Sequence, residues 1–254
     1  MKKNILILCA LEKEIRVAKK SLWSYKNKNI NIDFFVHGIW NINTSIHLTK
    51  KLSQTRYDFV LNYGVCWHRD SPRDLIQVIR SYYLPGKKEV CVPVFIQYAP
   101  LSGILCSEEP ISQKEDMQSE LYVDMESYAI EKVCESFKIP RLILKVPVDN
   151  VWEETLSFNS EHACKLLEKN IDFHDLILRT ETYLWSLPKK PDTEKYEALF
   201  AFTVSEKVIL QKYIQKFLML SSENIEDFVR EHAQSDKKTF LKSLENHIYN
   251  LWKL

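Results

Sequence analysis

Glycine is scarce in this chain of 254 residues, which contains four: Gly38, Gly64, Gly86 and Gly103. Because glycines are what usually let backbone N–H groups come close to a phosphate, a phosphate-cradling loop is not expected. The P-loop, G-x-G-x-x-G and G-x-S-x-G patterns are also missing from the sequence. Their absence argues against a P-loop NTPase, a dinucleotide-binding protein and a serine hydrolase.

An excess of charge of one sign is missing as well. Lysine and arginine total 35 and aspartate and glutamate 34, so the formal net charge is +1. This balance gives no electrostatic reason to expect nucleic acid or an anionic membrane as a partner. No apolar run approaches the roughly 20 residues that cross a bilayer. The N-terminal MKKNILILCALEKE turns acidic after a short apolar run, which favours a first strand over a signal peptide.

Cysteine and histidine show no ligand-like spacing. The six cysteines are Cys9, Cys66, Cys91, Cys106, Cys134 and Cys164. They form no C-x-x-C pair and lie mostly in apolar patterns, which predicts reduced core thiols in a cytoplasmic protein. The seven histidines form no H-E-x-x-H or similar pair. Neither a metal site nor a cofactor is therefore expected.

The segment from Leu121 to Asn150, LYVDMESYAIEKVCESFKIPRLILKVPVDN, carries the strongest local pattern. Its apolar positions recur at steps of three and four residues: Ala129, Ile130, Val133, Cys134 and Phe137. That spacing predicts one buried face of a helix, which Pro140 ends. The apolar run from Arg141 to Val148 is typical of a buried parallel strand. Asp149 follows it, at the strand end where open α/β sheets bind their ligands.

This segment resembles a known family. VDMESYA followed by VPVDN is similar to the nucleoside phosphorylase and nucleosidase superfamily, above all to its hydrolytic branch of methylthioadenosine/adenosylhomocysteine nucleosidases and futalosine hydrolases. The resemblance implies that Met125 packs on a ribose and that Glu126 binds the sugar hydroxyls. It also implies that Asp149 handles the proton that goes to the purine.

Three further blocks resemble the same family in the same order. Ala10 to Glu14 (ALEKE) resembles its A-M-E-x-E turn, which puts Glu14 in the place of the water-activating glutamate. HGIWNIN, from residue 37 to 43, resembles its G-I-G-x-x-N segment, and DFVLNYG, from 58 to 64, resembles the next strand with its terminal T-G. The resemblance covers roughly residues 1 to 187.

The chemistry explains these residue types. Cleaving a purine N-glycosidic bond makes an oxocarbenium-like ribose and an anionic base, so the site needs an acid for the base nitrogens and a general base for water. By the resemblance, Asp149 and Glu14 take these catalytic roles. Glu126 can accept a hydrogen bond from each hydroxyl of a vicinal diol. The resemblance also makes Gly64, Val65 and Ile111 substrate-binding residues, the last at the end of SGILCSEEPI, which is similar to the family's G-L-I-x-S-G-D-x-F-I.

The sequence departs from the family in three places. Val65-Cys66-Trp67-His68 stands where small residues follow the glycine, Trp40 replaces a glycine, and the stretch from Tyr82 to Glu120 is short. Bulky side chains in both loops narrow or reshape the expected pocket. A histidine at position 68 is more often an exposed loop residue than a catalytic one, and Asp124 is more often a solvated acid or a helix cap.

The predicted fold is α/β, a nucleoside phosphorylase-like mixed sheet flanked by helices, plus a small C-terminal helical appendage. Strands are expected near 4–9, 31–37, 57–63, 73–80, 90–97, 102–106 and 140–148, and helices near 11–23, 41–54 and 122–138. One long helix is expected from Asn159 or Ser160 to about Trp185. The predicted domains are 1–187, nucleosidase-like, and 188–254, a helical extension, with Pro188 to Asp192 as the linker.

The extension resembles no known family. Residues 206–220, 223–232 and 238–252 are expected to be helical, and the last of these carries an apolar stripe from Phe240 to Trp252. We expect the stripe to pack on the α/β core or on another subunit.

The leading prediction is an enzyme that hydrolyses the N-glycosidic bond of a purine nucleoside of the methylthioadenosine, adenosylhomocysteine or futalosine kind. A nucleoside phosphorylase is less favoured, because Glu14 stands where the phosphorylases hold phosphate with arginine. A diverged, non-catalytic nucleoside-binding or interaction protein is the other alternative. The expected partner is the nucleoside itself, without nucleic acid or membrane, and the chain is a candidate homodimer.

Overall fold

The computed structural model divides the chain into two compact units, Met1–Leu184 and Trp185–Leu254, called here the α/β unit and the C-terminal unit. It describes residues 2–69, 74–111, 117, 120–150, 159–187, 194–197, 199–220, 224–232 and 234–251. Of residues 149, 150, 194, 195, 215, 218–220 and 251 it describes the backbone alone. The expected linker from Pro188 to Asp192 lies outside the described residues.

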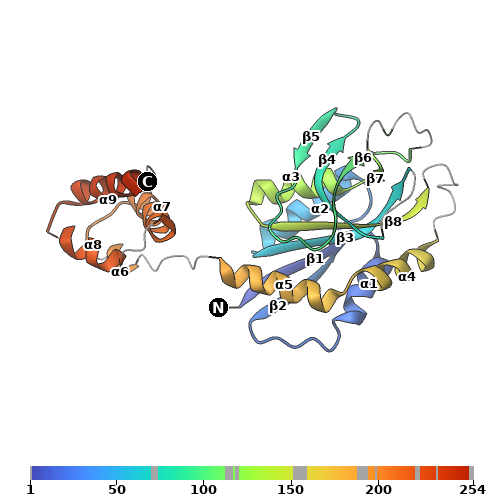
Figure 1. Cartoon of the computed structure of the whole chain (residues 1–254), viewed down its shortest axis with the longest axis horizontal. Helices are drawn as coiled ribbons and strands as arrows, with labels where there is room; N and C mark the ends of the chain where they lie inside the picture. The colour runs from blue at the N-terminus through green and yellow to red at the C-terminus, as the bar shows by residue number, and fades with distance from the viewer. Residues whose placement is uncertain are drawn as a thin grey trace. The chain divides into compact units, whose positions relative to one another are not determined.

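A mixed sheet forms the centre of the α/β unit (Figure 1). Its strands are β1 (Lys3–Cys9), β2 (Ile30–Val36), β3 (Phe59–His68), β4 (Ile76–Tyr83), β5 (Lys88–Cys91), β6 (Leu101–Cys106), β7 (Tyr122–Asp124) and β8 (Arg141–Asn150). They run in the order β2-β1-β3-β7-β6-β4-β5, with β8 pairing β3 and β4. β1 is parallel to both β2 and β3, as its continuous run of buried aliphatic residues predicts.

Five of these strands pair in a closed circuit. β3 is parallel to β8 and antiparallel to β7, β7 is parallel to β6, β6 is parallel to β4, and β4 is antiparallel to β8. Closing a sheet on itself removes the free edges that its strands would otherwise expose. β8 therefore has a neighbour on each side where it carries Leu144 and Lys145.

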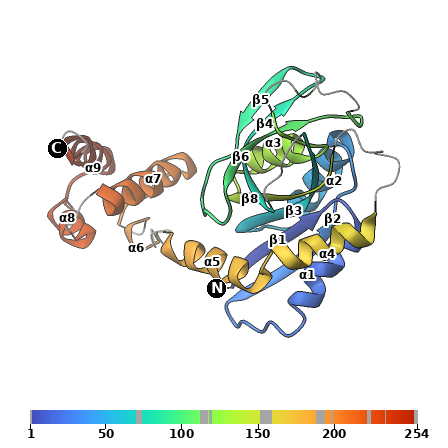
Figure 2. The same cartoon turned by 45° about the vertical axis from the view of Figure 1, so that its right-hand side comes forward.

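Helices cover both faces of this sheet (Figures 1 and 2). α2 (Asn41–Gln54) and α3 (Ser127–Phe137) lie on one face. α1 (Glu12–Ser21), α4 (Ser160–Asn170) and α5 (Phe173–Ser186) lie on the other. Aliphatic residues of β1, β3, β4 and β8 pack with α2 and α3 into one buried core. The predicted mixed sheet flanked by helices is thus confirmed.

The helix predicted from 122 to 138 is wrong at its start. Residues Tyr122–Asp124 form β7, and α3 begins at Ser127. The three residues of β7 are all buried and pair with strands on both sides, which a helix in the same place could not do. Asp124 then accepts hydrogen bonds from the backbone N–H and the hydroxyl of Ser127, so it caps α3 and is not a solvated acid.

The long helix predicted from 159 to 185 is two helices. Asn159 caps α4, as predicted, by accepting from the N–H groups of Glu161 and His162. The break comes at Ile171 and Asp172, where the Asp172 carboxylate accepts from two N–H groups of the next turn and starts α5.

Two strand predictions also need correction. The strand expected near 90–97 is β5, from Lys88 to Cys91, and Pro93 follows it without an N–H to donate. β3 continues through Trp67 and His68, which were expected in a loop, because both pair with β7 and β8.

The C-terminal unit is helical and has its own core. It contains α6 (Glu194–Glu197), α7 (Val204–Leu220), α8 (Ile225–His232) and α9 (Lys237–Leu251). The stripe on α9 is buried at Phe240, Leu244 and Ile248, in a cluster whose other members come from this same unit. The expectation that the stripe packs on the α/β core or a second subunit is therefore wrong for these residues. In the part of the chain that the structure describes, no helix is long and apolar enough to cross a membrane.

Candidate active site

A pocket of about 330 Å³ opens in the α/β unit beside the start of α1, the start of α2 and strands β3, β7 and β8. It is lined by Ala10, Leu11, Glu14, Ile39, Trp40, Gly64, Val65, Trp67, Pro110, Asp124, Met125, Glu126 and Lys145. Four of these residues are ionisable and the rest are apolar. The pocket is thus a largely apolar cleft with a small group of charges, as ligand sites commonly are.

Glu14 enters the pocket from the first turn of α1. Its Oε2 accepts a hydrogen bond of 3.0 Å from the N–H of Leu11, the residue before the helix. The Tyr63 hydroxyl donates to the Glu14 carbonyl oxygen at 2.6 Å, which ties the turn to β3. Glu14 is buried, and this burial raises the pKa of its carboxyl group above the usual value while the nearby Lys145 opposes the rise.

Lys145 lies in the middle of β8 and is buried among carboxylates. Its Nζ is 2.8 Å from Asp124 Oδ2 and 3.2 Å from Glu126 Oε2. Burial favours the neutral amine, but the charges of Asp124, Glu126 and Glu14 raise the pKa of Lys145 well above its usual range. The ammonium form is therefore the stable one, and it holds the β7–α3 turn against β8.

Glu126 has a pKa close to neutrality. Burial, the largest cause, and repulsion from Asp124 and Glu14 outweigh the attraction of Lys145, and the net effect raises the pKa of Glu126 to about 7. One cation faces three carboxylates, so one of them gains by holding a proton. A proton can therefore enter or leave this group near physiological pH.

Gly64 brings the backbone of β3 under these charges. A Cβ atom at this position would lie 3.6 Å from Glu14 Oε1 and 3.6 Å from Lys145 Nζ. The two ionisable side chains thus converge over the one pocket residue of β3 that has no side chain. Val65 follows it and also lines the pocket.

Two tryptophans line the pocket, and each is placed by an irregular backbone. Trp40 precedes α2 and has a φ of 74°, a positive value that residues other than glycine seldom adopt. Trp67 follows the point where the register of β3 against β8 shifts, which is a bulge. Three positions at which the sequence departs from the family that it resembles, Trp40, Val65 and Trp67, thus line the pocket. Met125 lies with them and is buried.

The described atoms do not place two of the predicted site residues, Asp149 and Ile111, in the pocket. Asp149 is next to last in β8 and pairs in register with Trp67, but its side chain lies outside the described residues. Ile111 packs with Leu105, Met117 and Val123 in a small apolar cluster, while its neighbour Pro110 lines the pocket. By contrast, Glu14, Gly64, Val65, Met125 and Glu126 all line the pocket.

Sequence reasoning missed Lys145 and underrated Asp124. Lys145 lies within the run from Arg141 to Val148, which the sequence analysis interprets as apolar. A lysine in the middle of a strand that is covered on both faces must nevertheless find carboxylate partners. This requirement could have identified Lys145 as a site residue from the sequence alone. Within the described residues, no group of three or more histidine, cysteine, aspartate and glutamate side chains is arranged to hold a metal ion.

No protein-family model and no curated protein sequence matches the chain. Solved structures do. A putative 5′-methylthioadenosine/S-adenosylhomocysteine nucleosidase from Francisella philomiragia superposes with a TM-score of 0.61 at 17% identity, over 69% of this chain and 98% of the other. The Campylobacter jejuni 5′-methylthioadenosine/S-adenosylhomocysteine nucleosidase gives 0.59 at 15%, over 70% and 99%. A futalosine hydrolase mutant of Helicobacter pylori gives 0.57 at 16%, over 68% and 99%. The chain has a nucleoside phosphorylase/nucleosidase-like fold.

Proposed function

We propose that the α/β unit hydrolyses the N-glycosidic bond of a purine nucleoside. The observation that carries this proposal is that Glu14 and Glu126 line one apolar pocket together with Lys145. Solved nucleosidases share the fold, which supports the same reaction class.

The pocket charges suit the charge that develops in this reaction. As the C–N bond lengthens, positive charge spreads over the ribose ring, and buried carboxylates stabilise it more strongly than water does. Glu126 points Oε2 at Lys145, and a carboxylate has further acceptor capacity for the ribose hydroxyls. Met125 then offers an apolar surface to the sugar.

Proton transfer completes the proposed cycle. Glu14 takes a proton from a water molecule as the water oxygen bonds to the anomeric carbon. The glycosidic bond breaks and its electron pair leaves with the purine, which receives a proton from Asp149. The products are the free sugar and the purine, and the enzyme is restored when Glu14 releases its proton to solvent and Asp149 takes one up. The raised pKa of Glu14 suits a general base that works near neutral pH.

Water is favoured over phosphate as the nucleophile. Lys145 is the one basic side chain among the described residues that line the pocket, and it already pairs with Asp124 and Glu126. A phosphate ion entering here would meet more carboxylates than cations. Phosphorolysis is therefore the less favoured reaction.

Nucleoside binding without turnover is the second candidate. Trp40 and Trp67 both line the pocket, and their bulk reduces the space left for a nucleoside. Trp40 is held with a positive φ, and backbone strain of this kind clusters at ligand sites. Binding of a planar base is compatible with this geometry whether or not catalysis follows.

The test is whether the protein releases purine from methylthioadenosine, adenosylhomocysteine or futalosine. Chromatography detects the purine in reactions run with and without phosphate. Glu14→Gln should lower the rate by a factor of about 100 to 10,000, because glutamine cannot take the proton. Glu12→Gln, which changes an exposed acid on the same helix, is the matched control and should keep full activity. Asp149→Asn should likewise abolish turnover.

Tryptophan quenching by a nucleoside without purine release supports the binding alternative. Release that requires phosphate makes the protein a phosphorylase. A wild-type protein that neither binds nor cleaves any of the three nucleosides overturns the proposal.

We also propose that the α/β unit forms a homodimer in the cytoplasm. Ile42 and Ile46 are 65% and 59% exposed on α2, and Ile39 beside them lines the pocket. An apolar surface next to a site favours association. Ile42→Lys/Ile46→Lys should then halve the mass in light scattering at about 0.5 M salt, at which contacts between exposed charges are screened. The buried free thiols, Cys9, Cys66, Cys106 and Cys134, suit a reducing compartment.

A further inference from the structure

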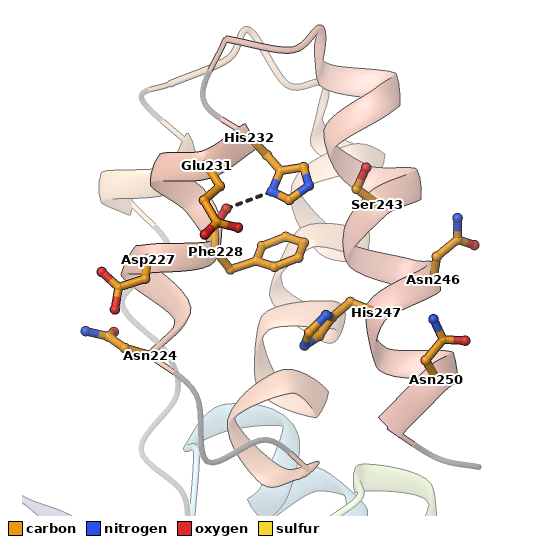
Figure 3. A pocket seen from close by; sticks show the side chains of 9 residues that line it. All are labelled: Asn224, Asp227, Phe228, Glu231, His232, Ser243, Asn246, His247 and Asn250. Atoms are coloured by element: carbon orange, nitrogen blue, oxygen red, sulfur yellow. Dashed lines mark hydrogen bonds between the residues drawn. The ribbon is translucent and has the colours of Figure 1, made fainter. Parts of the chain in front are cut away.

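Helix α9 separates two grooves of the C-terminal unit. The first, between α8 and α9, is a hollow of about 640 Å³ (Figure 3). Phe228 lies between the imidazoles of His232 and His247 at its centre, stacked on the former at 4.3 Å between ring centroids. Asp227 and Glu231 line it from α8, and amides such as Asn246 line it from α9.

This first groove is acidic. Asp227 and Glu231 are exposed, and none of the described residues that line the groove is a lysine or an arginine. Arg230, one turn from Asp227 on the same helix, pairs with it at 3.4 Å. That pair is well exposed on both sides, so it leaves the carboxylate available to a stronger partner. We call this surface the acidic groove.

The second groove, between α7 and α9, has the opposite sign. It consists of two adjoining hollows that share Ile209, Tyr213 and Glu245. Exposed lysines line both, Lys238 and Lys242 from α9 in one and Lys212 and Lys216 from α7 in the other, against the single carboxylate of Glu245. Glu245 already accepts from the Tyr213 hydroxyl and pairs with Lys242. None of the described carboxylates pairs with Lys212, Lys216 or Lys238. We call this surface the basic groove.

The basic groove also exposes apolar area. Ile209 on α7 is 41% exposed and Tyr249 on α9 is 59% exposed, and both line the groove. An apolar floor rimmed by charges of one sign is the usual anatomy of a binding surface for a partner of opposite charge.

We propose that the C-terminal unit binds a second copy of itself, with the basic groove of one copy against the acidic groove of the next. The two grooves lie on different sides of α9, so a single copy cannot bring its own charges together. An anionic membrane would account for the lysines but would leave the acidic groove without a role. A second copy accounts for both surfaces at once.

Such a contact is heterologous, because two different surfaces meet. Each copy that joins leaves one basic and one acidic groove open at the ends of the assembly. The assembly therefore grows until it closes into a ring or continues as a filament. Growth should depend on protein concentration and weaken as salt screens the charges.

The first experiment is sedimentation velocity of the full chain over a range of concentrations. The mean mass should rise with concentration by at least about twofold at low salt, and the rise should disappear at about 0.5 M salt. A mass that is independent of concentration in low salt overturns the proposal.

The second experiment neutralises each groove separately. One variant carries Lys212→Gln, Lys216→Gln, Lys238→Gln and Lys242→Gln, and the other carries Asp227→Asn and Glu231→Gln. Each alone should lose the concentration-dependent growth. When both also carry Ile42→Lys and Ile46→Lys, which remove the proposed dimer contact of the α/β unit, an equal mixture should form a pair that grows no further, since one intact acidic groove meets one intact basic groove. A mixture that does not pair contradicts the head-to-tail geometry.

The matched control removes four exposed lysines from the α/β unit: Lys2→Gln, Lys26→Gln, Lys28→Gln and Lys50→Gln. It changes the net charge as the basic-groove variant does and should grow like wild type, above whatever mass the α/β unit sets. Equal loss in the control would mean that net charge alone drives association. Constant mass together with lysine-dependent binding to phosphatidylserine vesicles would assign the basic groove to membranes and overturn the proposal.

Discussion

Charge is used in contrasting ways in the two units. In the α/β unit, the side chains of Lys145, Asp124 and Glu126 are at most 7% exposed, and Lys145 contacts both carboxylates. In the C-terminal unit, the lysines of the basic groove are exposed and face solvent. Buried charges interact strongly, so a single change has a large effect, whereas exposed charges are screened and act as a group. The first arrangement suits chemistry at one atom, and the second suits contact over a surface.

Removing the buried cation is the most severe test of this contrast. Lys145→Met leaves Asp124 and Glu126 buried without a positive partner, which should lower the free energy of unfolding by about 3 to 5 kcal/mol. Urea denaturation followed by circular dichroism measures it. Lys26→Met, at an exposed site, should stay within about 0.5 kcal/mol of wild type. If the two variants lose the same amount, the buried network does not stabilise the fold.

The pH dependence of stability sharpens the contrast next. Burial raises the pKa of Glu126 to about 7, above the value of about 4.3 for an unfolded chain. The folded state therefore binds the proton more tightly, so this group favours folding below the unfolded pKa, and that stability is lost as pH rises through about 7.

Glu126→Gln cannot titrate at this position and serves as the reference. The free energy of unfolding of wild type minus that of the variant should fall as pH rises from about 5 to about 8, by on the order of 3 kcal/mol. Urea denaturation at each pH measures this difference. A difference that rises with pH would contradict the sign and mean that Lys145 outweighs burial.

Trp40 allows a smaller test of strain in the pocket wall. Trp40→Gly and Trp40→Ala both remove the indole, but only glycine adopts a φ of 74° without steric cost. The glycine variant should be more stable than the alanine variant by about 1 to 3 kcal/mol, the usual cost of a sparsely populated backbone conformation. Both should bind nucleosides more weakly than wild type. Equal stabilities would show that the backbone relaxes when the indole is gone.

The smallest effect is expected from removing the C-terminal unit. Each unit has a separate hydrophobic core, so residues 1–187 should remain folded. Their melting temperature should shift by less than about 2 °C. Differential scanning calorimetry of the shortened and full chains compares them. Aggregation of the shortened chain would show that the α/β unit depends on the helices after all.

Much of the α/β fold could be predicted because local and long-range requirements agree in it. The apolar run of β1 and the spaced apolar face of α3 each have one stable environment in a layered fold. β7 was missed because three residues are too few for a period, and their strand identity comes from pairing with β3 and β6. Asp172 was missed because a single acid that caps α5 interrupts an otherwise helical pattern.

The site was partly predictable for a different reason. Glu14 and Glu126 stand in recognisable sequence blocks, so their positions along the chain could be named in advance. Lys145 has no such block around it, and its role follows from which side chains surround it in three dimensions. The charged grooves of the C-terminal unit were beyond reach for the same reason, since residues of α7 and α9 far apart in sequence form one surface.

β8 is paired with a strand on each edge, and this pairing holds its side of the pocket in place. Lys145 pairs with Gly64 of β3 on one side and with Ile76 of β4 on the other. Amide hydrogens held in this way exchange with solvent only when much of the sheet opens. The part of the pocket formed by Lys145 and Gly64 should therefore show the slowest amide hydrogen exchange. Ile39, Trp40 and Pro110 line the pocket from irregular backbone, and Ile39 and Trp40 are exposed, so a ligand can pass them while the buried charges stay in place.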